Sequence, residues 1–293
     1  MVHYVKREDL EVAKYNDCIE NSIQSRIYAF SWYLDIVADN WDVLVLNDYE
    51  AVMPVPWKQK YFIKYVTQPF FCQQLGVFSK EKFTKETQEE IIKKIPKKFV
   101  KVSLNFNSNN FFNKKMSKKK NYILKIEDSY LKNYKKFNSN RKRVLRRIEK
   151  DSLIIRETEF SNLIKLTKEN YSYLTYKDSD YKKIHLLSDK LKNKKHGFVL
   201  GVYKDEMLLG GVLFLKDNFR VTYLFSAVNT EGKKLNAATF LISEVLKKQI
   251  TQNYIFDFEG SMDSGIAKFF KSFGAVNENY YQYKTNAFQR ISI

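Results

Sequence analysis

The 293-residue chain has too few cysteines and histidines for several classes of site. Its two cysteines, Cys18 and Cys72, can form neither a disulfide framework nor a thiolate metal site within one chain. Its three histidines, His3, His185 and His196, lie far apart in the sequence and lack the spacing of metal ligands. The sequence therefore gives no support to metal catalysis or to Ser-His-Asp chemistry.

Long apolar runs are also missing. No stretch approaches the roughly 20 apolar residues that span a bilayer, and the opening MVHYVKREDLEV is charged from residue 6 onward. We therefore expect a protein without a transmembrane segment, located in the reducing cytoplasm. Hydrophobic residues still make up 44% of the chain and aromatic residues 16%, which is enough for packed cores and excludes global disorder.

Negative charge is scarce as well. Lys and Arg number 51 against 33 Asp and Glu, which gives a formal net charge of +18. So basic a chain favours phosphate-rich or otherwise anionic partners, although net charge bears on association and not on fold. Much of the excess is lysine spread along the whole sequence, a distribution that an AT-rich coding sequence also produces. Charge alone therefore identifies no partner.

The order of the expected elements is repeated in the two halves of the chain. In the first half, a helical opening at SWYLD leads to a hairpin around Asn47-Asp48, the strand YFIKYVTQP, a loop, a helix near residues 87–94 and the strand FVKVSLNF. In the second half, a hairpin around Lys204-Asp205 leads to the strand FRVTYLFSAV, a loop, a helix from about residue 236 to 249 and the strand YIFDFEG. Because hairpins dominate, we predict a mixed α/β fold of two similar domains, each a mostly antiparallel sheet flanked by helices. Their expected bounds are residues 1–127 and 128–293.

The segment YIFDFEGSMDSGIAKFFKSFGA, residues 254–275, carries the strongest site signal. Side chains of a strand alternate between its faces, so Asp257 and Glu259 are expected to share one face, opposite two phenylalanines. Gly260 and Gly265 allow a sharp turn, and an aromatic helix is expected to follow until Gly274. Two interpretations stay open, since paired acids at a strand end either serve catalysis or cap the next helix.

The run YLKNYKKFNSNRKRVLRRIEKDSL, residues 130–153, is the densest positive stretch and lies between the halves. If Asn140 caps a helix there, Val144, Leu145 and Ile148 form a narrow apolar stripe. The side chains expected on a neighbouring exposed face are Arg143, Arg147 and Lys150. Aromatic residues just before this helix favour stacking and phosphate contacts with a nucleic acid, and the alternative is a solvated linker helix.

Together these segments resemble a known family. NRKRVLRRIEKDSL, the hairpin strand LLGGVLFL, and LNAATFLISEVLKKQITQNYIFDFEGS followed by FFKSFGA are similar to the FemAB-like peptidyltransferases and related acyltransferases, which are tandem versions of the GNAT fold. The resemblance covers nearly the whole second half, and the first half shares the element order and a likeness around SWYLD and QQLGVF. It implies a transferase that moves an acyl or aminoacyl group onto an amine or hydroxyl acceptor held between two domains. The alternative is a non-catalytic RNA-binding or scaffolding protein that keeps the fold.

The sequence departs from the family's pattern at three places. Ser152 replaces a glycine at the end of the basic segment. When Phe273-Gly274 is aligned with the end of the family's Phe-Lys-x-x-Phe-Gly pattern, Phe270 stands at the position of the family's lysine, and Lys271 follows one residue later. The segment NTEGKKLN, residues 229–236, holds one glycine where the GNAT pyrophosphate loop holds two small residues. A standard grip on acetyl-CoA is therefore not expected, and the donor is left open between acyl-CoA and aminoacyl-tRNA, with no permanently bound cofactor.

Transfer to an amine needs a base, a proton donor and a hold on the donor substrate. The expected catalytic residues are Asp257 and Glu259 as bases and Tyr281 as proton donor. Free N–H groups and the helix dipole favour an anion before the helix near residue 236, where the expected binding residues are Lys233, Lys234, Leu235 and Asn236. The residues expected to contact substrate are Trp32, Tyr33, Gln73, Gln74, Arg143, Arg147 and Lys271. The plainer alternatives are a capped helix with surface lysines, and aromatic side chains that belong to a core.

Overall fold

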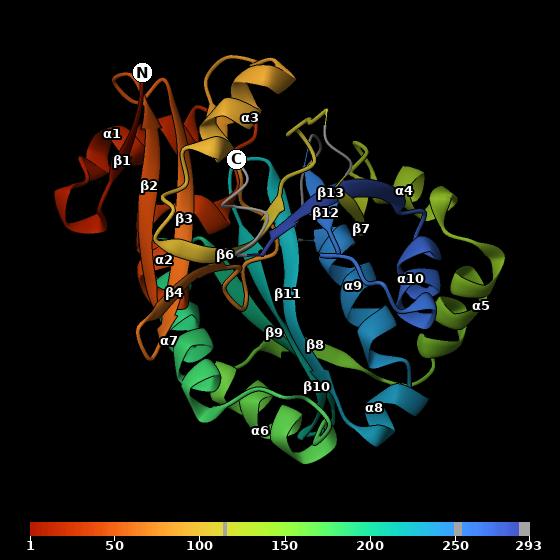
Figure 1. Ribbon diagram of the computed structural model, residues 1–293. Coiled ribbons are helices and arrows are strands. Elements are labelled where there is room, and N and C mark those ends of the chain that lie inside the picture. Colours follow the sequence, from red (N-terminus) through yellow and green to blue (C-terminus); the bar gives the residue numbers. More distant parts are fainter. Residues whose placement is uncertain (114–115, 249–253, 287–293) are drawn as a thin grey trace. The chain divides into compact units, whose positions relative to one another are not determined.

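The computed structural model describes residues 1–113, 116–248 and 254–286 (Figure 1). The chain forms two compact units, and each is described by itself. Unit 1 is Met1–Lys119 together with the chain from Asn279 onward, and unit 2 is Lys120–Glu278. Helices and strands are mixed in both units, which confirms the predicted mixed α/β class. The division into two domains at residue 127 stays a prediction.

The strands of unit 1 are mostly antiparallel. In sheet order they are β1 (Val2–Val5), β2 (Asn40–Leu46), β3 (Ala51–Lys60), β4 (Ile63–Thr67), β6 (Phe99–Phe106) and the later part of β13 (Val276–Thr285), with β5 (Phe78–Ser79) paired to β3. The predicted hairpin around Asn47-Asp48 and the predicted strand FVKVSLNF are confirmed. Among the described strands of this unit, β4 and β6 pair in parallel.

The described residues of unit 1 also form three α-helices and short 3-10 turns at Arg7–Asp9 and Ile27–Ala29. They are α1 (Val12–Glu20), α2 (Ser31–Val37) and α3 (Lys85–Lys93). The predicted opening helix at SWYLD is α2, and the predicted polar helix is α3. It begins two residues earlier than expected because the Thr84 side chain caps it by accepting a hydrogen bond from Thr87 N.

The strands of unit 2 include a long antiparallel meander. In sheet order they are β7 (Ser117–Lys125), β12 (Ile255–Asp257), β11 (Arg220–Val228), β10 (Met207–Lys216), β9 (Gly197–Lys204) and β8 (Ile154–Glu157). The hairpin predicted around Lys204-Asp205 joins β9 and β10, and the predicted third strand is β11. Among the strands that the structure describes in this unit, β11 and β12 pair in parallel.

Helices cover both faces of this sheet (Figure 1). On one face, Val212 of β10 shares a core with side chains of α4 (Tyr130–Lys136), α5 (Ser139–Ile148), α9 (Ala237–Lys248) and α10 (Ser264–Lys271). On the other face are α6 (Phe160–Asn170) and α7 (Asp178–Lys194), and Leu163 of α6 lies against Gly211. Adjacent residues of β10 thus point to opposite helix layers, as strand alternation requires.

The basic run folds into two helices, α4 and α5, which corrects the predicted cap. Asn138, not Asn140, caps α5, because its side chain accepts a hydrogen bond from Arg141 N at 2.8 Å. The predicted apolar stripe is confirmed: Leu145 and Ile148 are buried in the core of unit 2, and Val144 packs against it. The side chains predicted to be exposed, and found exposed, are Arg143, Arg147 and Lys150.

Candidate functional site

Strands β11 and β12 separate after a short parallel pairing in unit 2. Their last paired residues are Thr222 and Asp257, beyond which β11 continues to Val228. The segment that follows β12 turns away at Glu259 and Gly260, whose φ angles are 59° and 76°. A Cβ at Gly260 would lie 2.3 Å from the Lys120 carbonyl oxygen, so this turn requires glycine. Among the residues that the structure describes, no strand pairs with this edge of β11 after Thr222.

A β-bulge lies on β11 at the point of separation. Leu213 of β10 pairs with Phe225 and Phe214 with Tyr223, so Leu224 is an extra residue. Phe225 accordingly packs on Phe160 of α6 at 5.4 Å between ring centroids, whereas Tyr223 lies 6.4 Å from Phe270 of α10, on the opposite helix layer. The bulge changes the direction of the backbone N–H and C=O groups of β11 just where that strand loses its partner.

A buried ion cluster joins β11 to β12. Arg220, with 6% of its surface exposed, donates to the carboxylate of Asp257 and to both Glu278 carboxylate oxygens, at 3.3 and 3.4 Å. Burial lowers the pKa of Arg220, but the charges of Asp257 and Glu278 outweigh it and leave that pKa raised. Asp257 also accepts a hydrogen bond from Glu259 N at 2.8 Å. These bonds favour a structural role for Asp257, whose catalytic role stays a prediction.

Glu259 has a different environment from Asp257. Strand β12 ends at Asp257, so strand alternation does not fix the direction of the Glu259 side chain. Glu259 is half-buried and lies near Tyr176: burial, followed by the charge of Glu259, raises the pKa of Tyr176. Tyr176 belongs to the connection between α6 and α7, and its ring centroid is 6.4 Å from that of Phe225. The sequence analysis missed Tyr176, although the tyrosine-rich run YSYLTY marks this connection.

The same connection holds the end of β11. The Tyr171 hydroxyl donates to Val228 O at 3.0 Å and accepts from Val228 N at 3.1 Å. The Lys233 ammonium lies 4.8 Å from the centre of the Tyr171 ring, a cation–π geometry. Tyr171 therefore occupies both backbone groups of the last residue of β11.

The predicted anion loop is a short helix, which corrects the expected loop. Residues Thr230–Lys234 form α8, and Asn229 caps it by accepting from Gly232 N at 2.7 Å. Lys234 pairs with Glu231 at 3.3 Å. Leu235 packs against the core of unit 2, and Asn236, with φ of 57°, precedes α9. The helix expected from residue 236 is confirmed through Lys248, and Gln249 lies outside the described residues. The anion-binding role of this segment stays a prediction.

The basic helix α5 divides into a buried and an exposed arginine set. Arg141 is buried: its Nε donates to Ser272 Oγ at 2.8 Å, its Nη1 donates to Thr239 Oγ1, and two phenylalanine rings flank it at 4.6 and 4.7 Å. Burial lowers the pKa of Arg141 to about 10. By contrast, Arg143 is exposed and donates to Asn140 at 3.0 Å, and Arg147 is exposed. Arg141 thus holds α5 against α9 and α10.

The predicted lysine of the closing helix lies at the end of α10. Lys271 is exposed, and its ammonium is 5.7 Å from the centre of the Tyr122 ring. The acid that caps this helix is Asp263, which accepts from Ile266 N at 2.9 Å, so neither Asp257 nor Glu259 is its cap. Gly265 lies within the first turn of α10 and takes no part in the sharp turn, which is made at Glu259 and Gly260.

Five predicted site residues belong to unit 1. Tyr33 is fully buried and donates to Phe71 O, while Trp32 is half-buried with its ring 6.5 Å from that of Phe30. Gln74 is buried and donates to Gln73 Oε1 at 2.6 Å. Tyr281 and Tyr283 pack against one core, so they share a face of β13. Their contacts favour core and loop packing, and the substrate and acid roles of Trp32, Tyr33, Gln73, Gln74 and Tyr281 stay predictions.

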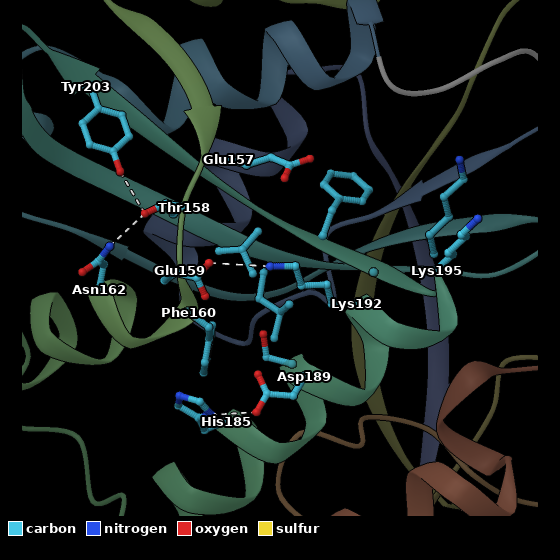
Figure 2. A pocket seen from close by; sticks show the side chains of 16 residues that line it. Glu157, Thr158, Glu159, Phe160, Asn162, His185, Asp189, Lys192, Lys195 and Tyr203 are labelled. Atoms are coloured by element: carbon cyan, nitrogen blue, oxygen red, sulfur yellow. Dashed lines mark hydrogen bonds and ion pairs between the residues drawn. The ribbon is translucent and has the colours of Figure 1, made fainter.

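Unit 2 also contains a separate cavity of about 590 Å³ (Figure 2). Figure 2 shows Tyr203 donating to Thr158 Oγ1, which also accepts from Asn162, while His185 and Asp189 pair at 3.2 Å. Also in the lining of this cavity, Lys192 Nζ lies 3.6 Å from Glu159 Oε1. Lining side chains come from the end of β8, the start of α6, one face of α7, and β9 and β10. None of the residues predicted from the sequence lines this cavity.

Two features are absent from the described ranges. No group of three or more His, Cys, Asp or Glu side chains there is arranged to hold a metal ion. No helix in the same ranges has the length and apolar character needed to cross a bilayer.

No family model matches this chain, and no curated protein matches it. Solved structures do share its fold. FemX is 12% identical with a TM-score of 0.71, covering 97% of this chain and 98% of that one. A tandem GNAT protein from the clavulanic acid biosynthesis pathway is 8% identical with a TM-score of 0.58, covering 98% and 99%. L-PGS from Bacillus licheniformis is 11% identical with a TM-score of 0.57, covering 95% and 94%. These similarities confirm the FemAB-like, tandem GNAT type of fold, and at such identities they establish the fold alone.

Proposed function

We propose that this tandem GNAT-fold chain is an acyl- or aminoacyltransferase whose reaction centre lies in unit 2, where β11 and β12 separate. The observation that carries the proposal is the bulged end of β11 beyond Thr222, with Glu259 at the turn that leaves β12. An unpaired strand edge offers backbone N–H and C=O groups to an extended amide-containing ligand, which binds as an added strand. The donor substrate would lie along this edge.

Glu259 is the proposed general base. It would take a proton from the acceptor amine as the nitrogen attacks the donor's carbonyl carbon, so that an amide forms and a thioester or ester bond breaks. Backbone N–H groups at the Leu224 bulge would stabilise the oxyanion that develops on that carbonyl. Tyr176, whose hydroxyl is protonated at neutral pH as in any ordinary tyrosine, would donate a proton to the leaving thiolate or ribose oxygen. Asp257 as base and Tyr281 as acid are the alternatives within the same reaction.

Aminoacyl-tRNA is the donor that we favour over acyl-CoA. Both lysines next to the α9 start already have partners, since Lys233 lies over Tyr171 and Lys234 pairs with Glu231. A compact CoA pyrophosphate would have to displace these contacts. A tRNA would instead spread its phosphate contacts over α5, which packs against α9 and exposes Arg143 and Arg147. This donor also agrees with the predicted cytoplasmic location.

Mass spectrometry of the natively purified protein tests the donor, and site variants then test the base. We expect tRNA to copurify, and Glu259→Gln to lower turnover with that donor by about 10²- to 10⁴-fold while the protein stays folded. Asp189→Asn, in the separate cavity, is the matched control and should keep full activity. If Glu259→Gln and Asp257→Asn both transfer as fast as the unaltered chain, this reaction centre is wrong.

A non-catalytic RNA-binding protein is the second candidate, which the exposed arginines of α5 favour. Binding that neutralises Z phosphates weakens with log salt at a slope of roughly −0.7Z to −0.9Z. Reversing Arg143 and Arg147 to Glu should flatten the slope for tRNA under either candidate. The second candidate holds if tRNA binds in this way but no donor yields transfer.

A further inference from the structure

The turn between β3 and β4 in unit 1 exposes three large apolar side chains in a row. The exposed fractions are 82% for Tyr61, 98% for Phe62 and 54% for Ile63. Single exposed apolar residues are ordinary on a protein surface, whereas three consecutive ones form a continuous patch. Such a patch at the end of a hairpin is convex, so it suits insertion into a soft partner and not the filling of a groove.

The hairpin holds these side chains away from unit 1. Its strands pair in regular register from Trp57 opposite Val66 to Lys60 opposite Ile63, so the loop has only two residues. Tyr61 takes a left-handed backbone conformation with φ of 53°, and its carbonyl oxygen accepts from the Gln59 side chain at 2.8 Å. The apolar residues therefore stand at the tip of an ordered turn (Figure 1).

Two segments at this end of the strands are rich in lysine. The hairpin segment KQKYFIKY holds three lysines, and the segment KKIPKKFVK that leads into β6 holds five, with no Asp or Glu in either. Parallel pairing sets Lys64 opposite Phe99, so Lys97 and Lys98 lie at the same end of the strands as the tip. Lys58 pairs with Asp39 at 3.0 Å. Apolar and positive side chains thus meet at one end of unit 1.

We propose that this hairpin tip inserts into the surface of a membrane that contains anionic lipids. Aromatic rings favour the headgroup level of a bilayer, and the lysines would meet lipid phosphates around the inserted tip. An apolar anchor and a basic patch together give binding that neither gives alone. A nucleic acid is disfavoured because single strands bind in grooves that present ring faces, whereas this tip is convex and ends in Ile63 beside its two rings.

Vesicle flotation of the whole chain tests this surface without using transfer activity, so its outcome is separate from that of the proposed reaction. The protein should float with phosphatidylcholine vesicles containing about one third phosphatidylglycerol, and far less with phosphatidylcholine alone. Tyr61→Ser combined with Phe62→Ser should lower the partition coefficient by about tenfold or more, since the variant loses the two aromatic side chains that the bilayer surface would bury. Phe219→Ser is the matched control: Phe219 is 62% exposed between β10 and β11, and its loss should change nothing.

Two further variants separate the apolar and the electrostatic parts. Lys60→Glu with Lys98→Glu should abolish the preference for anionic vesicles. Phe62→Trp should add tryptophan fluorescence whose emission maximum shifts to shorter wavelength when the protein binds vesicles. The proposal is overturned if the unaltered protein does not float with anionic vesicles, or if the serine variant floats equally well. It is also overturned if the serine changes weaken tRNA binding in a protein that does not float.

Discussion

Two parallel strand pairs in the described part of the chain, β4 with β6 and β11 with β12, differ in what lies beyond the pairing. In unit 1 the pairing of β4 and β6 runs to Thr67 opposite Ser103, and the chain itself then covers the rest of β6. Gln68 N donates to Ser103 O at 3.0 Å, and Leu75 N donates to Asn105 O at 2.8 Å. In unit 2 no described strand covers β11 beyond its pairing with β12. The edge of β6 is thus covered by its own loop, whereas the edge of β11 after Thr222 has no described strand on it and is where we propose that the donor lies.

This difference explains where the predicted glutamines lie. Gln73 and Gln74 belong to the segment that covers β6, and the Gln73 carbonyl accepts from the Asn105 side chain at 3.0 Å. Gln74 accepts from Ser108 N at 3.3 Å. Repetition of an element order therefore does not repeat a site, because a few loop residues decide whether a strand edge is free. The comparison predicts that changes in unit 1 alter stability, whereas changes in unit 2 also alter function.

The largest effect is expected where the ion cluster fixes the separation of β11 and β12. Arg220→Met would leave two carboxylates without their cation, Asp257 fully buried and Glu278 partly so. Removing one partner of a buried ion pair costs about 3–5 kcal/mol, because the remaining charge is uncompensated. Urea unfolding should show this loss. Arg156→Met, which removes an exposed pair with Glu206, should stay within about 1 kcal/mol. Equal losses of unfolding free energy in Arg220→Met and Arg156→Met would contradict a stabilising role for the buried ion cluster.

The sequence predicted the strands well because their signals are local. Both hairpins and β6 follow from alternating apolar residues bounded by turn residues, and β6 has the predicted bounds. The sequence could not reveal the ion cluster, because Arg220 is 37 residues from Asp257 and 58 from Glu278. The alternation of side chains predicted that Asp257 lies on a strand, but it could not identify Arg220 as the partner of Asp257. The alternation does not extend to Glu259, where the backbone is left-handed.

The helix α8 was missed for a different reason. Asn and Gly in NTEGKKLN are turn residues, which favoured a loop. In the structure the Asn229 side chain caps the helix that they were expected to prevent. Tyr176 was missed because its importance depends on Glu259, 83 residues later by their residue numbers, 176 and 259. Contacts between distant segments are therefore where local patterns cease to predict a site.

The second effect tests the closed edge of unit 1. The Gln68 side chain accepts from Asn105 N at 3.0 Å and donates to Cys72 O at 2.7 Å. Gln68→Ala leaves both backbone groups without this partner, which should cost about 1–3 kcal/mol of unfolding free energy. Transfer activity per folded molecule should not change. Gln59→Ala, on the exposed hairpin, serves as control and should cost less than about 1 kcal/mol. A loss of activity with Gln68→Ala would place unit 1 in the reaction and end the comparison.

Alkaline pH tests unit 1 in another way. Burial raises the pKa of Cys18 from 9.0 to about 11. Above pH 9 the unfolded chain therefore releases the thiol proton while the folded chain keeps it, so stability is full below pH 9 and falls between pH 9 and 11. At pH 10 the loss attributable to Cys18 should be on the order of 1 kcal/mol. Thermal unfolding of Cys18→Ala should lack this part of the decline, and Cys72→Ala should retain it. If the stability of the unaltered chain and that of Cys18→Ala fall equally between pH 9 and 11, the decline does not come from the Cys18 thiol.

The smallest effect, and the one that best separates the two strand pairs, concerns the end of β11. Tyr171→Phe removes the hydroxyl that occupies both backbone groups of Val228. Val228 is half-buried, so water can replace part of these bonds, and stability should fall by only about 0.5–1.5 kcal/mol. If the donor lies along this edge, a looser β11 end should raise the KM for the donor severalfold and leave kcat nearly unchanged, because ground-state and transition-state binding weaken together. Tyr173→Phe, with 74% of its residue surface exposed, is the control and should change neither quantity. A KM for the donor that stays constant in Tyr171→Phe, despite the measured loss of stability, would show that the free edge of β11 is as structural as the covered edge of β6.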